Sequence, residues 1–256
     1  PYPLTFNNQS VDFLTYAKTG EFMVAGFDTD GDENTQIYAL SSQGGKLISL
    51  RSNEGERHFF NYLTTDGKRL YYSTTTGNAS FLNSHLYDIE TGEDKVLLEG
   101  TIAPTSIEAV SPAEKTFVSS KQFGNTYSLA YVHIGNETFL MTPETKEQHT
   151  VSEALYTSET EIYFLTNYNS DLTYLAKFDL EAKEFKKVLE IEKEDFSSIH
   201  FSKKTASLYL VGSYGVEDRL YEFHLTNETL KEVKAPTSVV EKVVIMPSGN
   251  LYIQGR

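Results

Sequence analysis

Three aspartates alternate in the segment FDTDGDENTQIYAL (residues 27–40), as the oxygen ligands of a calcium loop do. An EF-hand loop also requires glycine at its sixth position and a bidentate glutamate at its twelfth. Counted from Asp28, those two positions hold Glu33 and Ala39. The spacing therefore predicts a turn over 28–35 that joins two strands, because Asp, Gly and Asn are the residues that turns favour.

The six histidines form none of the local patterns of zinc sites, such as His-x-His or His-Glu-x-x-His. They are His58, His85, His133, His149, His200 and His224. His58 and His200 begin or follow segments with strand character in different parts of the chain, so they could still converge after folding. We predict no metal and no other cofactor, and keep a metal site built from these two histidines as an alternative.

The segment GERHFFNY (55–62) carries the most suggestive pair of side chains, because Arg57 and His58 are adjacent where a strand is expected to begin. A cationic pair there could meet the carboxylate of a peptide, or of a partner domain, through charge-assisted hydrogen bonds. Arg57 and His58 are therefore the candidate substrate- or domain-contact residues. Ordinary loop packing is the alternative.

No residue pattern predicts a nucleophile. The chain has no cysteine, which removes thiolate nucleophiles, thiolate metal ligands and disulfides. The serine of an α/β-hydrolase lies in Gly-x-Ser-x-Gly at a strand–helix elbow. The segment VGSYGV (211–216) places its glycines at the wrong spacing, and no βαβ pattern surrounds it. We predict no catalytic residue in this chain.

Composition narrows the class of protein further. The chain has 256 residues and a net charge of −14, which argues against a nucleic-acid-binding surface because a phosphate backbone requires a basic stripe. No apolar run approaches the length needed to cross a bilayer, so we predict no membrane span. The absence of cysteine and of a signal-peptide pattern favours a cytoplasmic bacterial protein.

The elements that would position these residues recur along the chain. A tight turn flanked by alternating apolar residues lies near residues 20, 67, 114, 160, 205 and 249, a repeat of about 45 residues. Period-two alternation, as in RLYEFHL (219–225), is typical of strands, and the 17 Tyr and 16 Phe fit strand propensity. Four short strands in each repeat predict an all-β fold, a β-propeller of four-stranded antiparallel blades. A pair of β-sandwiches is the alternative.

We predict a single β-propeller domain over 1–256. The expected blades lie at approximately 11–51, 56–99, 104–142, 150–190, 195–234 and, as a partial blade, 238–256 with 1–8. The first eight residues read as a lone outer strand, which either helps to complete the last blade or is left by a cut from a longer ring. The pattern favours five complete blades and a partial one, from a six- or seven-bladed parent.

Two stretches resemble a known family. The segment DTDGDENTQIYAL (28–40) resembles the Asp-x-x-Gly-x-Glu-x-x-Gln-Leu-Tyr segment in the propeller of prolyl-oligopeptidase-type serine peptidases, above all the acylaminoacyl-peptidase/dipeptidyl-aminopeptidase branch. The stretch TTDGKRLYYSTTTGNASFLNSHLYDIETGEDKVLL (64–98) is similar to the next blade of those proteins. The distinctive parts are 28–38 and 65–93, and Asp-Gly-Lys turns also occur in TolB-like propellers.

The resemblance implies a non-catalytic propeller that gates the access of short peptides to a separate α/β-hydrolase domain, expected after residue 256. Its partners would be that C-terminal domain of its own parent chain and peptide substrates. Two alternatives stay open. The chain could be a stand-alone TolB-like propeller that binds a protein partner as a scaffold, or a metal-dependent lyase of the oligogalacturonate-lyase type with its site at the propeller axis.

Overall fold

The computed structural model describes residues 4–5, 8–246 and 248–256. These residues form strands, turns and connecting segments, and no helix occurs among them. Accordingly, the described part of the chain contains no helix long and apolar enough to cross a membrane. The strand expected over residues 1–8 falls largely outside the described residues.

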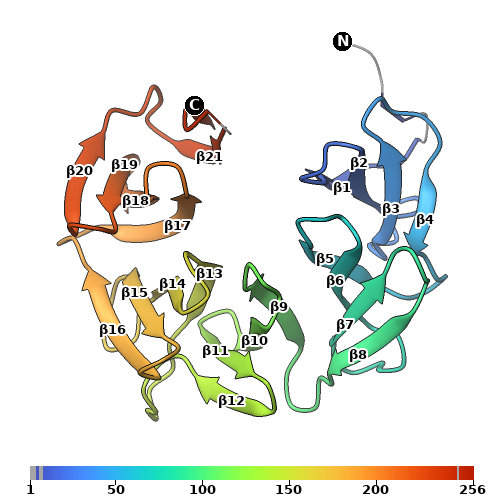
Figure 1. Cartoon of the computed structure of the whole chain (residues 1–256), viewed down its shortest axis with the longest axis horizontal. Coiled ribbons are helices and arrows are strands. Elements are labelled where there is room, and N and C mark those ends of the chain that lie inside the picture. Colours follow the sequence, from blue (N-terminus) through green and yellow to red (C-terminus); the bar gives the residue numbers. More distant parts are fainter. Residues whose placement is uncertain (1–3, 6–7, 247) are drawn as a thin grey trace. The chain divides into compact units, whose positions relative to one another are not determined.

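The strands form antiparallel sheets in which neighbours in the sheet are also neighbours in the chain (Figure 1). The first sheet contains β1 (Val11–Tyr16), β2 (Phe22–Phe27), β3 (Gln36–Ser41) and β4 (Ile48–Arg51). The second contains β5 (His58–Leu63), β6 (Arg69–Thr74), β7 (Asn83–Asp88) and β8 (Asp94–Leu98). The third contains β9 (Thr105–Val110), β10 (Thr116–Gly124), β11 (Tyr127–Ile134) and β12 (Glu137–Leu140).

The later sheets repeat this order. The fourth contains β13 (Val151–Tyr156), β14 (Glu161–Thr166), β15 (Tyr174–Asp179) and β16 (Glu184–Leu189). The fifth contains β17 (Asp195–Ser202), β18 (Ser207–Tyr214), β19 (Glu217–His224) and β20 (Thr229–Val233). The sixth has two strands, β21 (Val240–Ile245) and β22 (Leu251–Gly255). Sequential four-stranded meanders are propeller blades, so the prediction of an all-β propeller fold with five complete blades and a partial one is confirmed.

The chain divides into two compact units. Unit 1 contains the residues up to Ile107 together with Ser119–Phe123, and unit 2 contains Glu108–Val118 together with Gly124–Arg256. The division runs through β9 and β10 of the third sheet. That all blades belong to a single domain stays a prediction.

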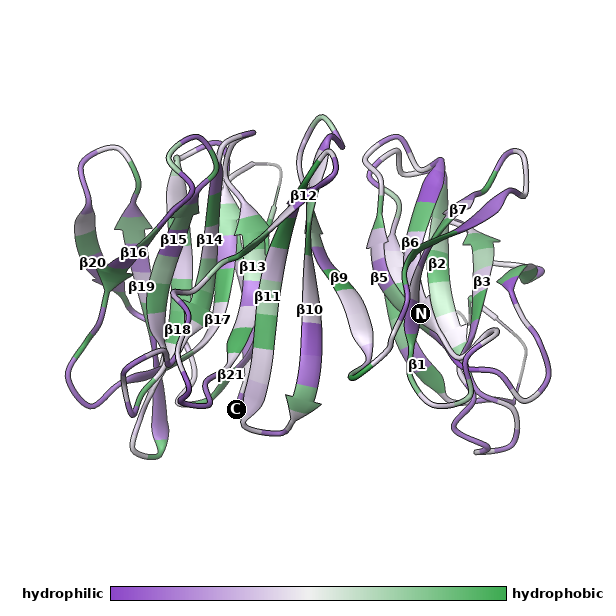
Figure 2. Ribbon diagram, turned by 90° about the horizontal axis from the view of Figure 1, so that it is seen from below, coloured by the Kyte–Doolittle hydropathy of each residue, from purple (hydrophilic) through white to green (hydrophobic). Residues whose placement is uncertain are grey.

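Each unit has its own hydrophobic core, because a sheet with apolar residues on its faces must pack against a neighbour to bury them. In unit 1, Val24 and Ile37 of the first sheet pack with Leu70 and Tyr72 of the second, and all four are fully buried. In unit 2, separate clusters join successive sheets. Figure 2 shows the matching pattern, with hydrophobic bands on the strands and hydrophilic residues in many of the connecting loops.

The tight turns fall where the repeat predicts them, between the first and second strands of each sheet. The Asp-Gly-Lys turn illustrates the cause. Asp66 Oδ1 accepts hydrogen bonds from the Thr64 hydroxyl (2.6 Å) and the Lys68 backbone N–H (3.1 Å). Gly67 has a φ of 74°, which glycine adopts without steric cost.

The first strand of a sheet often carries a β-bulge, in which one extra residue disturbs the pairing with the second strand. Such irregularities occur in five of the sheets. They lie between Val11 and Phe13, Phe60 and Tyr62, Ser152 and Leu155, Phe196 and Ser198, and Val240 and Lys242. A bulge changes the direction of nearby side chains. Residues next to a bulge can therefore point to a different side of the sheet than they would in a regular strand.

Candidate functional site

The predicted contact pair lies beside a pocket of about 500 Å³ in unit 1. The pocket is lined by Asn34, by Gly55, Glu56 and Arg57 before β5, and by the loop that follows β6. Arg57 is exposed and forms part of the wall, whereas His58 is completely buried. The structure therefore gives these two neighbours different environments, and only Arg57 can touch a ligand directly.

The backbone and the Nε atom of Arg57 are held by hydrogen bonds, whereas its terminal guanidinium nitrogens are not held by any described residue. Its backbone N–H donates to Thr75 Oγ1 (3.0 Å), and the Thr75 N–H donates to the Arg57 carbonyl (3.2 Å). Its Nε donates to Asn34 Oδ1 (3.2 Å). The two terminal nitrogens of the guanidinium have no hydrogen bond or ion pair with any residue in the described ranges. They are the donors that a carboxylate would engage in a bidentate pair.

The segment with the alternating aspartates supports Arg57. Asp32 Oδ1 accepts from the backbone N–H groups of Thr29 (3.1 Å) and Asn34 (2.9 Å), and Oδ2 accepts from Asn34 Nδ2 (3.1 Å). These bonds, first that of the Asn34 backbone, lower the pKa of Asp32. Because β2 ends at Phe27 and β3 begins at Gln36, the predicted turn is confirmed. This turn positions Asn34, which in turn holds Arg57.

His58 is a neutral, hydrogen-bonded residue of the interior. Its Nδ1 shares a hydrogen bond with Thr74 Oγ1 (2.9 Å), and its ring centroid lies 5.8 Å from that of Tyr72. Burial, followed by the charge of Arg51, lowers the pKa of His58 to about 4. An imidazole that is uncharged at neutral pH and closed off from solvent does not bind a peptide carboxylate by charge.

Glu56 links the buried histidine to the pocket wall. Its Oε2 accepts from Thr76 Oγ1 (2.6 Å) and Asn53 Nδ2 (2.7 Å), and lies 3.9 Å from His58 Nε2. The Thr76 hydroxyl is in turn 2.9 Å from Thr74 Oγ1, the hydrogen-bond partner of His58. The hydrogen bond from Thr76 is the main cause of the lowered pKa of Glu56. His58 thus acts on the pocket only by positioning its neighbours.

Next to His58, whose ring lies beside that of Tyr72, a polar network joins the first sheet to the second. Arg51 Nη2 contacts Asp94 Oδ2 (2.8 Å), the Tyr72 hydroxyl donates to the same oxygen (2.8 Å), and His85 Nδ1 lies 3.2 Å from Oδ1. Burial opposes the ionisation of Asp94, but the bonds from His85 and Tyr72 and the charge of Arg51 outweigh it and lower its pKa. Sequence analysis missed Arg51 and Asp94, which lie 43 positions apart in the sequence and share no motif.

The two histidines of the alternative metal site lie in different units, His58 in unit 1 and His200 in unit 2. Within the part of the chain that the structure describes, no three His, Asp or Glu side chains gather as a metal site requires. The described residues therefore do not fit a bound metal of the lyase type, and we derive no chemistry from one.

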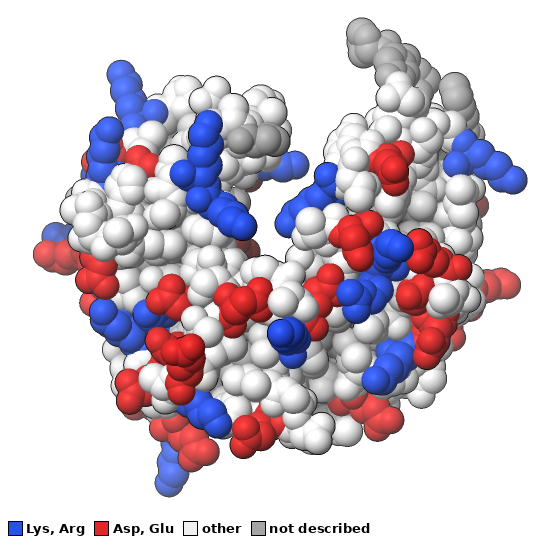
Figure 3. Space-filling model, viewed as in Figure 1, with Lys and Arg blue, Asp and Glu red and all other residues white. Residues whose placement is uncertain are grey.

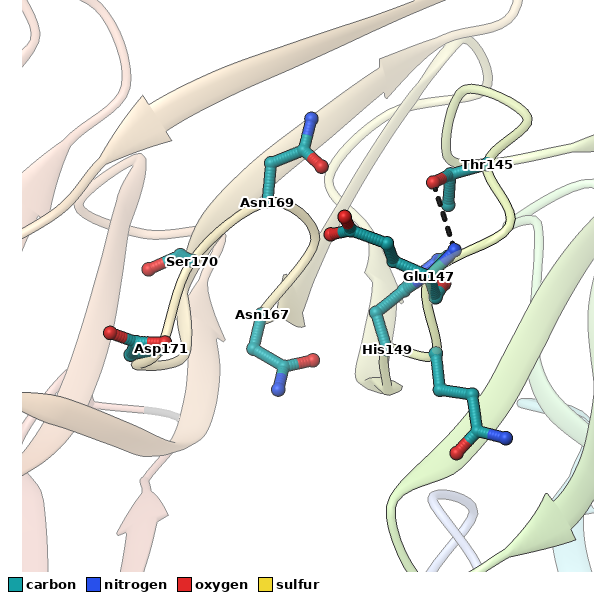
Figure 4. A pocket seen from close by; sticks show the side chains of 8 residues that line it. Thr145, Glu147, His149, Asn167, Asn169, Ser170 and Asp171 are labelled. Atoms are coloured by element: carbon teal, nitrogen blue, oxygen red, sulfur yellow. Dashed lines mark hydrogen bonds between the residues drawn. The ribbon is translucent and has the colours of Figure 1, made fainter.

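A larger pocket, of about 580 Å³, lies in unit 2 between the segment before β13 and the loop that joins β14 to β15 (Figure 4). Glu147 directs its carboxylate into the space between the two segments, on the side of Asn169. The hydroxyl of Thr145 accepts from the backbone N–H of Glu147 (3.1 Å), which orders this rim. Asn167 uses its Oδ1 to accept from the Thr150 N–H (2.7 Å). The walls are polar and include no Lys or Arg among the described residues.

Charges elsewhere are interspersed. On the face viewed in Figure 3, acidic and basic side chains lie among one another over each unit, without a continuous basic stripe. Exposed ion pairs join the last hairpins of neighbouring sheets in unit 2, as between Lys183 and Glu137 (3.5 Å) and between Lys186 and Glu228 (3.4 Å). Such exposed pairs contribute little to stability.

No known family profile and no curated protein sequence matches this chain. Solved structures do. Prolyl oligopeptidase B from Galerina marginata matches over 96% of this chain and 38% of its own, with 15% identity and a TM-score of 0.71. Oligogalacturonate lyase from Vibrio parahaemolyticus matches over 96% of this chain and 71% of its own, with 13% identity and a TM-score of 0.73. TolB from Acinetobacter baumannii matches over 91% and 56%, with 12% identity and a TM-score of 0.62.

The likeness shows the β-propeller fold. Identities of 12–15% do not extend it to activity, because one fold carries many unrelated functions. The chain spans less than half the length of the prolyl endo- and oligopeptidases that it matches. A relation to the propeller regions of those peptidases, and the branch of the family, are matters for proposal.

Proposed function

We propose that this chain is the non-catalytic propeller of a serine peptidase of the prolyl-oligopeptidase superfamily, from the acylaminoacyl-peptidase/dipeptidyl-aminopeptidase branch. It would gate the access of short peptides to a separate α/β-hydrolase domain in the parent chain. The observation that carries the proposal is a combination: 28–38 and 65–93 resemble that family in sequence, and the whole fold matches a prolyl oligopeptidase over 96% of this chain.

Gating in this proposal is a property of the scaffold. Antiparallel blades close their hydrogen bonds internally and pack through apolar faces, so they deform little. A rigid propeller in front of an active site admits chains that are narrow and flexible, and rejects folded proteins. No propeller residue needs to take part in breaking the peptide bond.

Arg57 gives the proposal a specific contact. Its free guanidinium tip could pair with the carboxylate of a short peptide or with an acidic residue of the hydrolase domain. Asn34 and the turn held by Asp32 keep the side chain oriented, so less rotamer entropy is lost when the pair forms. The His58–Thr74–Thr76–Glu56 chain would fix the wall beside it.

The decisive experiment uses the full parent protein. We expect it to react with a fluorophosphonate probe and to cleave short peptides but not a folded protein of the same cleavage sequence. Arg57→Ala should raise KM for peptides several-fold and leave kcat unchanged. The reason is that a contact made equally with the bound peptide and with the transition state contributes to binding and not to the chemical step. The matched control is Lys95→Ala, which removes another exposed cation of unit 1. A parent protein that does not react with the probe would refute the peptidase proposal.

A TolB-like scaffold that binds a protein partner is the second candidate, and the match to TolB favours it. The fold likeness alone does not rank the two, and the sequence resemblance is what favours the peptidase. If the parent protein is inert towards the probe and instead forms a stoichiometric complex with a protein partner, the scaffold replaces the peptidase. The lyase alternative would require stoichiometric metal in the purified protein, which metal analysis measures directly.

A further inference from the structure

A small pocket of about 220 Å³ in unit 2 lies apart from the Arg57 site. It is lined by Glu153 of β13, by Ser198 and His200 of β17, by Val211 of β18, and by residues 240–243 of β21. Its volume is about seven times the 30 Å³ that one molecule occupies in liquid water. This is room for a small organic group.

The strands place opposite charges on two sides of the pocket. β13 and β21 both contact β17, which carries His200 and Ser198 towards the pocket. Glu153 comes from β13, and Lys242 and Glu241 come from β21. Val211, Val240 and Val243 add an apolar wall. The pocket therefore offers an anionic group, a cationic group and a surface for an aliphatic side chain.

Glu153 adopts a conformation that needs an explanation. It has a φ of 53° and lies within the bulge between Ser152 and Leu155. The left-handed region is sterically unfavourable for a non-glycine residue, and such outliers cluster where a side chain has a task. The residue as a whole is exposed, but burial of its carboxyl raises the pKa of Glu153. The negative charge of Glu108 raises this pKa further, and a hydrogen bond from the Ile199 backbone lowers it. A cation bound beside Glu153 would offset that repulsion.

His200 differs from the other histidines of the chain. Those five each share a hydrogen bond with another side chain: His58 with Thr74, His85 with Asp94, His133 with Thr138, His149 with Thr142 and His224 with Ser207. His200 has no such bond with any residue in the described ranges, and burial lowers its pKa. A neutral imidazole leaves one nitrogen as a donor and the other as an acceptor, both available to a ligand.

We propose that this pocket binds a zwitterion of the amino-acid type, either a free amino acid or a very short peptide. Glu153 and the acceptor nitrogen of His200 receive the ammonium group, Lys242 pairs with the carboxylate, and the valines contact an aliphatic side chain. The choice of a peptide rests on the proposed function, in which short peptides pass this domain. The chemistry of the pocket itself does not depend on it.

The test is a titration of this chain with the dipeptide Ala-Ala, followed by chemical-shift changes in 15N-labelled protein. We expect saturable shifts confined to β13, β17 and β21. Acetylation of the dipeptide's amino group should weaken binding at least 10-fold through Glu153 and His200. Amidation of its carboxylate should weaken it through Lys242. Equal affinity for all three ligands, or the absence of saturable shifts, would overturn the proposal.

Variants give an independent arm. Glu153→Gln should weaken Ala-Ala at least 10-fold and make the affinities for Ala-Ala and acetyl-Ala-Ala similar. Glu192→Gln, which removes an exposed carboxylate of the same unit, should change neither. Should Glu153→Gln fail to fold, the comparison of the three ligands on the unmodified chain still decides. Because the assay needs no hydrolase, Ala-Ala binding with an inert parent protein would refute the peptidase proposal alone, and a reactive parent without binding would refute this one alone.

Discussion

His58 in unit 1 and His200 in unit 2 are both removed from solvent to a large extent, and burial lowers the pKa of both. Their surroundings differ. His58 is enclosed by Thr74, Tyr72 and Glu56, and its environment is polar and connected. His200 lies on a pocket wall without a hydrogen bond to another described residue. Burial alone therefore does not distinguish a structural histidine from a candidate ligand-binding one. His58 uses Nδ1 in a hydrogen bond and leaves Nε2 enclosed without a partner, whereas His200 has no such bond and faces a pocket.

The comparison extends to the charges around each residue. In unit 1 Arg51, Tyr72 and His85 all contact the carboxylate of Asp94. Arg51 Nε, His58 Nε2 and His85 Nε2 are nevertheless buried without a hydrogen-bond partner among the described residues. In unit 2 the pocket places Glu153, Glu241 and Lys242 around His200. The network around Asp94 joins two sheets. In the pocket of unit 2, Glu241 is paired with Arg256 (3.5 Å), whereas Glu153 and Lys242 form no ion pair with a described residue and are the charges available for binding.

The largest effect should come from removing the carboxylate at the centre of the Asp94 network. Asp94 itself is partly exposed, but Asp94→Ala leaves the buried Tyr72 hydroxyl and the buried His85 Nδ1 without their acceptor, and each buried polar group left unpaired costs about 1–3 kcal/mol. We expect a loss of about 3 kcal/mol in the free energy of unfolding, measured by urea denaturation. Glu93→Ala, which removes the adjacent exposed carboxylate, is the control and should change stability by less than about 0.5 kcal/mol. A small effect of Asp94→Ala would show that the network is dispensable.

The next largest effect concerns pH. The pKa of His58 is lowered to about 4 in the folded protein from 6.5 in the unfolded chain, so the unfolded state binds the proton first as pH falls. The stability that depends on neutral His58 is complete above 6.5 and is lost as pH falls towards 4. From pH 7 to pH 5 the loss is about 2 kcal/mol. His58→Asn should flatten this part of the urea-derived stability curve, and an unchanged slope would contradict the assignment.

The smallest effects on stability are expected at His200 and Arg57, two of the residues proposed to contact a ligand. His200→Asn and Arg57→Ala should each change the free energy of unfolding by less than about 0.5 kcal/mol, because neither side chain completes a buried hydrogen-bond network. Because the pKa of His200 is lowered in the folded protein, protonation of this residue at low pH favours the unfolded state. The pKa of Glu153 is raised, so protonation of Glu153 favours the folded state, and the two effects on stability partly cancel. A loss of 2 kcal/mol or more from His200→Asn would remove the distinction between the two histidines.

Turns and strands of this protein could be predicted from local residues. Asp88 and Asp179 are the last residues of β7 and β15, and each accepts hydrogen bonds from the backbone N–H groups two and three residues ahead. The same short-range chemistry explains the Asp66 turn and the turn held by Asp32. Because these contacts span at most three residues, the repeat was readable without coordinates.

The site was only partly predictable. Adjacency suggested that Arg57 and His58 act as a pair. Arg57 lies just before β5 and is exposed, whereas His58 begins the strand and is buried, so the structure separates the two side chains. Asp94 escaped notice because its partner Arg51 belongs to another sheet. Glu153 escaped notice because no residue type announces a bulge in which a glutamate has a positive φ.

By itself the order of residues determined the period, the strands, the tight turns and the all-β propeller fold, since these follow from alternation and from turn chemistry within a few residues. Tertiary structure alone decided which histidine is enclosed and which faces a pocket, and which carboxylates meet a cation. Those outcomes depend on contacts between strands far apart in the chain, whose pairing and bulges set the direction of every side chain.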